Sequence, residues 1–109
     1  METEFCKLEI FIPTTHLEVL CEALWSADAG HIGKYDRCLS YSEVTGCFRP
    51  LKGTRPYLGK ENKVCYVREY KVEVTCRTDQ AGNVIRGVKQ VHPYEEPVIN
   101  VIPLLEVGL

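Results

Sequence analysis

The residues best suited to chemistry lie in one short segment, His92–Pro97, with the sequence His-Pro-Tyr-Glu-Glu-Pro. It holds an imidazole, a phenol and two carboxylates between two prolines, and each proline restricts its own backbone and that of the residue before it. On this stiff frame, His92, Tyr94, Glu95 and Glu96 are the expected contacts of a small ligand or a metal ion. Adjacent carboxylates on an extended backbone point to opposite faces, so these two are poorly placed to share one ion within a chain.

A structural role for the same segment is the favoured interpretation. The segment would then be a proline-framed joint between a helix and the last strand, and its polar side chains would make hydrogen bonds at an oligomer contact. A joining role explains conformationally constrained residues more simply than chemistry does.

A second candidate lies near the middle of the chain, where His31 is followed by Tyr35 and Asp36. A carboxylate near an imidazole can orient it as a base or as a metal ligand. Taken alone, His31 is better interpreted as part of a helix-to-strand turn, where it pairs with the carboxyl end of a helix. If His31 and His92 met in space, the two with Glu95 or Glu96 would form a set suited to zinc or another divalent transition metal.

The third candidate is the stretch 46–62, where four cationic side chains stand among glycines: Arg49, Lys52, Arg55 and Lys60. Glycine-rich backbone with guanidinium groups suits a phosphate or carboxylate, so a small anionic ligand is one expected partner. No Walker sequence is present, and a solvated hairpin loop is slightly favoured. No pairing of a nucleophile with a base is found either, so no catalytic residue is predicted.

These candidates need elements to position them, and hydrophobic periodicity predicts six. Alternating apolar residues predict strands, and apolar residues at helical spacing predict two helices. The strands are expected over 4–12, 35–45, 63–77 and 98–105, and the helices over 15–28 and from 79 to 92. Thr15 and Glu18 form a capping-box pattern, Gly30 fits a helix C-terminal glycine, and Asp79 is the expected cap of the second helix. Pro103 predicts an edge or a bulge in the last strand.

This order of elements predicts an α+β ferredoxin-like βαββαβ fold, with an antiparallel four-stranded sheet and two helices on one face. The opposite face of the sheet then has no helix to cover it, and its phase carries Phe5 and Phe11 among polar residues. A partly apolar bare face predicts self-association.

Bulk composition fits one globular domain over 1–109. The 109 residues are 45% hydrophobic and 26% charged with a net charge of −2, which argues against nucleic-acid binding by a basic face. No apolar run approaches a membrane span and no signal core is present, so a cytoplasmic protein is expected. The six cysteines lack Cys-x-x-Cys spacing; Cys6 and Cys21 are expected in the core, and Cys38 and Cys47 could face each other across a hairpin.

Four motifs together resemble a known family. They are Gly30-His31-Ile32-Gly33-x-Tyr35-Asp36, Gly46-x-Phe48-Arg49-Pro50-Leu51-x-Gly53, Pro56-Tyr57-x-Gly59 and Val91-His92-Pro93-Tyr94-Glu95-Glu96-Pro97. In this order they are similar to the small domain inserted in proteins of the Nif-three-like (YqfO-type) dinuclear-metal family. The resemblance implies a domain akin to CutA and the PII signalling proteins, which assemble as trimers. The flanking domains that hold the two-metal site in that family have no counterpart here, so a hydrolase role is not carried over.

The primary hypothesis is a non-enzymatic homotrimeric module that binds a small ligand or a divalent metal at subunit junctions. His31, Arg49 and the segment 92–96 would line the cleft, with His31, His92 and Glu95 as the expected metal ligands. One alternative is a structural module that only docks a protein partner. The other is a small metal-dependent hydrolase with its metal at His31 and His92.

Overall fold

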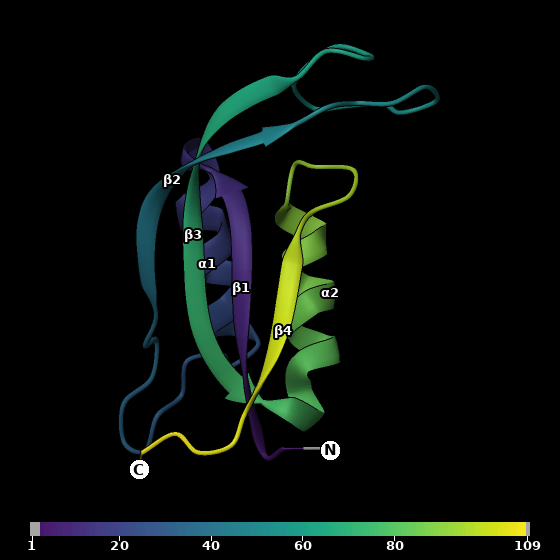
Figure 1. The fold of residues 1–109 in the computed structure, drawn as a ribbon. Coiled ribbons are helices and arrows are strands. Elements are labelled where there is room, and N and C mark those ends of the chain that lie inside the picture. The colour runs from purple at the N-terminus through teal and green to yellow at the C-terminus, as the bar shows by residue number, and fades with distance from the viewer. Residues whose placement is uncertain (1–2, 109) are drawn as a thin grey trace.

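The computed structural model describes residues 3–108 and contains one four-stranded sheet with two helices. The elements are β1 (Phe5–Pro13), α1 (Leu17–Ser26), β2 (Ser40–Phe48), β3 (Cys65–Arg77), α2 (Ala81–Val91) and β4 (Ile99–Leu104), with 3-10 turns at Thr14–His16 and Thr78–Gln80. The strand order is β2-β3-β1-β4, every pairing is antiparallel, and both helices lie on one face (Figure 1). The predicted ferredoxin-like α+β fold is confirmed. No helix within these residues has the length and apolar character needed to cross a membrane.

The core forms where the two central strands face the helices. Alternate residues of β1 are buried because successive side chains of a strand point to opposite faces. The fully buried aliphatic side chains are Leu8, Ile10 and Ile12 of β1, Val72 of β3, Leu20 and Leu24 of α1, and Val84 and Val88 of α2. Each contributes about 1.5–3 kcal/mol relative to an exposed position. This burial holds both helices against one face and leaves the other face uncovered.

The uncovered face carries a compact network of ion pairs. Glu9 and Glu73 are directly opposed across β1 and β3, which would be repulsive for two carboxylates alone. Lys7 lies between them, with Nζ 2.7 Å from Glu73 and 3.6 Å from Glu9, and Lys71 Nζ lies 3.5 Å from Glu9. The hydrogen bond from Lys7, together with its charge, lowers the pKa of Glu73. Phe5 is half-buried on the same face, so this surface is polar at its centre and partly apolar at its rim.

The strand predicted over 35–45 instead begins at Ser40 and ends at Phe48. The preceding residues fold into a compact turn, in which Ile32 and Tyr35 exchange two backbone hydrogen bonds of 2.7 and 2.9 Å. Gly30 anchors this turn: its N–H donates to the Thr75 carbonyl at 2.8 Å, and its carbonyl accepts from the Cys38 N–H at 2.9 Å. Local apolar alternation could not reveal these contacts because they depend on a distant strand.

The predicted helix caps differ from the observed ones. Thr15 does not cap α1; its hydroxyl pairs with His16, and the chain enters the helix through a 3-10 turn. At the other end Asp28, two residues before Gly30, occupies the left-handed position that ends the helix (φ 57°), and the Ala29 N–H donates to the Leu24 carbonyl at 3.0 Å. This geometry is a Schellman-type end, and an aspartate tolerates it because its short polar side chain bonds locally.

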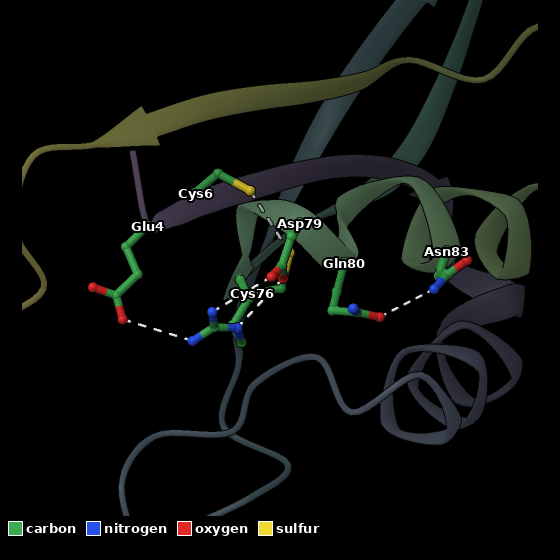
Figure 2. A network of polar contacts seen from close by, with 7 residues as sticks. Glu4, Cys6, Cys76, Asp79, Gln80 and Asn83 are labelled. Carbon is green, nitrogen blue, oxygen red and sulfur yellow. Dashed lines mark hydrogen bonds and ion pairs between the residues drawn. The ribbon is translucent and has the colours of Figure 1, made fainter. Parts of the chain in front are cut away.

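Asp79 likewise does not cap α2, whose N-cap residue is Gln80. The carboxylate of Asp79 instead lies 3.3 Å from Nε of Arg77, and the guanidinium of Arg77 also lies 3.6 Å from the carboxylate of Glu4 (Figure 2). The aspartate therefore ties the end of β3 to the chain before β1, because an arginine two residues away offers a stronger charged partner than a backbone N–H.

The cysteines divide between the core and the surface. Cys6 and Cys76 face each other across β1 and β3 with their Sγ atoms 3.7 Å apart (Figure 2), and Cys21 is also buried, as predicted for Cys6 and Cys21. The prediction that Cys38 faces Cys47 is wrong: Cys38 precedes β2 and Cys47 lies near the far end of that strand.

The turn after α1 allows a matched glycine test. Gly30 and Gly33 both have positive φ, 82° and 59°, but a Cβ at Gly30 would collide with the Cys38 carbonyl, whereas one at Gly33 would meet nothing within 4 Å. We expect Gly33→Ala to lower the free energy of unfolding by about 1 kcal/mol, and Gly30→Ala by about 1–3 kcal/mol more. Urea denaturation measures both, and equal losses would contradict the close approach.

Candidate functional site

A pocket of about 500 Å³ lies where the loop between β2 and β3 meets the segment between α2 and β4. In Figure 1 the β2–β3 hairpin extends beyond the rest of the sheet and its loop swings toward the loop that follows α2. Each wall comes from a different part of the chain: Phe11 of β1, Phe48 of β2, Arg49 and Tyr57 of the loop, Glu69 of β3, and Tyr94, Glu95 and Glu96. By strand alternation, Phe11, Phe48 and Glu69 belong to the uncovered face of the sheet.

His92 is a buried residue next to this pocket, and hydrogen bonds hold its ring in place. It is 7% exposed, its Nε2 donates to the Phe11 carbonyl at 2.7 Å, and its Nδ1 accepts the Tyr94 backbone N–H at 3.1 Å. This pairing requires the neutral ring protonated on Nε2. Burial lowers the pKa of His92, and this effect outweighs the bond to the Phe11 carbonyl and the nearby Glu69 carboxylate, which both raise it. Because the Nδ1 lone pair is engaged, His92 offers no nitrogen to a metal within one chain, and its contacts match the favoured joint interpretation.

Tyr94 continues the chain of contacts into the pocket. Its ring lies 4.9 Å from that of His92, and its hydroxyl donates to Glu69 at 2.7 Å. Burial first, and the bond to Glu69 second, raise the pKa of the Tyr94 hydroxyl, so it stays a protonated donor. Tyr94 thus joins the proline-framed segment to the middle of β3.

Glu69 is the site residue that sequence reasoning missed. Its place in the alternation of β3 marks it as polar and solvent-facing, yet it is only 6% exposed. Gly46 of β2 makes this burial possible, because a Cβ at that position would collide with the Glu69 carboxylate. Gly46 was expected in the loop that starts at residue 46, so it gave no signal; only its place inside β2 marks the close approach that a strand glycine often allows.

The loop is held to the pocket by one backbone bond and several rings. The Arg55 N–H donates to Glu95 Oε2 at 2.9 Å. The Tyr94 ring centroid lies 5.9 Å from that of Phe48 and 6.3 Å from that of Tyr57, within the range of favourable aromatic contacts. The loop expected to be solvated is therefore partly docked on the segment 92–98.

The other predicted site residues lie in the turn after α1. His31 Nδ1 lies 3.0 Å from the carboxylate of Asp28, and its Nε2 donates to the Gly33 carbonyl at 3.1 Å. The partner of His31 is thus Asp28 rather than the expected Asp36, and the bond to Asp28 raises the pKa of His31. Tyr35, 76% exposed, and Asp36 do not contribute to the pocket.

His31 and His92 are not brought together within the chain. The turn of His31 is bonded to Thr75 near the end of β3, whereas His92 is bonded to Phe11 near the opposite end of the sheet. Residues 3–108 contain no group of three or more side chains suited to hold a metal. The metal set of His31, His92 and Glu95 does not form in one chain, whereas Arg49, Tyr94, Glu95 and Glu96 do share the pocket.

Comparison with known proteins confirms the resemblance seen in the motifs. The chain is 41% identical over 102 residues to a GTP cyclohydrolase 1 type 2 homolog of Halalkalibacterium halodurans. The matched region covers 94% of this chain and 27% of that protein. A Bacillus subtilis protein of the same name is 35% identical over 90% of this chain and 26% of its own. The chain thus spans about a quarter of the length of these relatives. No protein-family model matches.

Solved structures agree with the sequence relatives. A Bacillus cereus protein related to NIF3 matches with a TM-score of 0.81 and 36% identity, over 95% of this chain and 26% of that one. The periplasmic divalent cation tolerance protein CutA of Archaeoglobus fulgidus matches with a TM-score of 0.70 and 22% identity, over 96% and 87% of the two chains. The fold is therefore that of CutA.

The environment of His92 predicts a specific pH dependence. Its pKa is lower in the folded than in the unfolded chain, so below about pH 6.5 the unfolded state binds more protons and stability falls as the pH falls. We expect His92→Ala to cost about 1–3 kcal/mol near neutral pH, since it leaves the Phe11 carbonyl and the Tyr94 N–H unpaired. The variant should also lose part of the acid-dependent decline.

Urea denaturation across about pH 7 to pH 5 measures this effect. His31→Ala is the matched control, because the raised pKa of His31 stabilises the folded state at low pH and that contribution fades as the pH rises. If the free energy of unfolding of His92→Ala changed with pH in parallel with that of the unmodified protein, this would contradict a buried neutral ring.

Proposed function

We propose that this chain, homologous over most of its length to a segment of Nif3-related proteins and folded like CutA, is a non-catalytic binding module for a small ligand. The observation that carries the proposal is the pocket of about 500 Å³ between the β2–β3 loop and the segment 92–98. Ligand sites have volumes of about 300–1,000 Å³, apolar walls and a few convergent polar groups. Here aromatic rings form the walls and Glu69 lies at the base.

The proposal includes assembly as a homotrimer. Support comes from the uncovered face of the sheet, where Phe5 and Phe11 are half-buried beside the ion-pair network. A partly apolar face of this kind is typical of surfaces that associate. Phe11 also lines the pocket, so a second copy on this face would extend the pocket wall and place the ligand at a subunit junction.

Metal-dependent hydrolysis is the less supported alternative. The relatives are named as cyclohydrolase homologs, but this chain spans only about a quarter of them. Both ring nitrogens of His92 and of His31 already face partners, so these residues do not fit a catalytic metal within one chain. A purely structural docking module remains the second candidate, since His92 and Glu95 both make internal bonds.

The oligomer is tested by light scattering coupled to size exclusion. We expect a mass three times the 12.4 kDa of the chain. Phe5→Glu places a charge on the uncovered face and should shift the protein to the monomer, whereas Val19→Glu on the exposed surface of α1 should leave the trimer intact. A clean monomer for the unmodified chain would contradict the proposed assembly.

The pocket is tested by a fragment screen followed by amide chemical shifts. We expect binders to raise the melting temperature and to move the amide signals of Gly46 and Tyr94. Leu51→Trp fills the pocket that Leu51 lines and should abolish the response, whereas Lys52→Trp, next to it but outside the lining, should preserve it. A library that never moves the pocket signals would favour the docking module instead.

A further inference from the structure

Glu69 is a buried carboxylate for which the described residues supply no counter-ion. Among residues 3–108 the only buried polar or charged side chains are Glu69 and His92, at 6% and 7% exposure. Both ring nitrogens of His92 are hydrogen-bonded. The carboxylate of Glu69 accepts only one hydrogen bond from the described residues, which the neutral Tyr94 hydroxyl donates to Oε2. No lysine or arginine of the described residues forms an ion pair with it. Burial of a carboxylate without a cation is costly, so its retention needs a reason.

The pocket beside Glu69 is acidic overall. Its lining contains three carboxylates, Glu69, Glu95 and Glu96, and one cation, Arg49. The other basic residues of the β2–β3 loop, Lys52, Arg55, Lys60 and Lys63, are exposed, and none of the four lines the pocket. A concave site lined mainly by one sign of charge concentrates ligands of the opposite sign.

Aromatic rings complete the wall around the carboxylate. Tyr94 lies within 5.9 Å of Phe48 and 6.3 Å of Tyr57, centroid to centroid, at tilts of 52° and 49°. Ring faces attract a cation, most strongly in a desolvated site, and a flat cation such as guanidinium can also stack on them. The combination of rings with a buried carboxylate suits a cation better than an anion.

We infer that the pocket binds a small organic cation with a flat N–H-donating head, an amidinium or guanidinium, and that Glu69 is its counter-ion. This inference rests on the proposed function of the pocket. Glu69 Oε2 is held by Tyr94, and Oε1 has no hydrogen-bond partner among the described residues, so the carboxylate keeps an acceptor for such a head. A flat ligand would lie against the rings of Tyr57 and Tyr94 that line the pocket, in place of the anion that the loop cations suggested.

Three probes of one shape and different charge test the inference: benzamidine, benzamide and benzoate. We expect benzamidine alone to raise the melting temperature and to move the amide signals of Gly46 and Tyr94. Glu69→Gln keeps an acceptor for the Tyr94 hydroxyl but removes the charge, so benzamidine affinity should fall about tenfold or more. Glu61→Gln makes the same charge change on the exposed loop outside the pocket and should bind as the unmodified protein does.

The unliganded variants supply an independent measurement. If Glu69 is retained for a ligand, Glu69→Gln should melt at the same temperature as the unmodified protein or higher, because an unpaired buried charge has been removed. Loss of binding in a destabilised variant would overturn the inference, as would equal benzamidine affinity in Glu69→Gln.

The remaining outcomes separate the inference from the proposed function. Binding of benzoate or benzamide as tightly as benzamidine, with the same pocket signals moving, overturns the cation assignment and leaves the pocket as a ligand site. If none of the three probes at millimolar concentration changes the melting temperature or the pocket signals, the assignment is also overturned. The wider fragment screen decides independently whether the pocket binds anything.

Discussion

The site depends on the double hydrogen bond of the His92 ring. One nitrogen donates to the Phe11 carbonyl of a central strand, and the other accepts the backbone N–H of Tyr94, two residues further along the chain. The ring thereby fastens the end of α2 to β1 and sets the direction of the following segment. Because the ring is buried and neutral, no solvent competes for either bond. Tyr94, which lines the pocket, is positioned directly by this attachment.

Tyr94 in turn is hydrogen-bonded to Glu69 of β3, and Glu95 accepts a hydrogen bond from the backbone of Arg55 in the β2–β3 loop. The result is a pocket whose walls belong to segments far apart in sequence but joined by few contacts. It contains the Glu69 carboxylate, whose burial is costly and which no cation within residues 3–108 neutralises. Natural proteins accept such local costs at functional sites, where the gain appears only when a partner is bound. The arrangement therefore favours a binding role over a purely structural one.

Sequence reasoning succeeded where a pattern has one physical cause. Alternation along residues 5–13 and helical spacing from Leu17 onward both arise from burial against one layer, so the sheet, the helices and their shared face were predictable. It failed where several partners compete for one group. Thr15 forms a hydrogen bond with His16, and Asp79 forms an ion pair with Arg77, in place of the backbone N–H groups that each was expected to cap. The late start of β2 has a similar origin, because Gly30 bonds to Thr75.

The sequence by itself determined the fold class, the uncovered face of the sheet and the segment His92–Pro97 as a distinctive joint, because hydrophobic period and proline geometry act locally. Only the tertiary structure decided which polar residues meet. It separated His31 from His92, buried Glu69 against Gly46, and placed Arg49 among three carboxylates. The physical reason is that burial and hydrogen-bond partners of a side chain are properties of the packed chain, set by residues dozens of positions away.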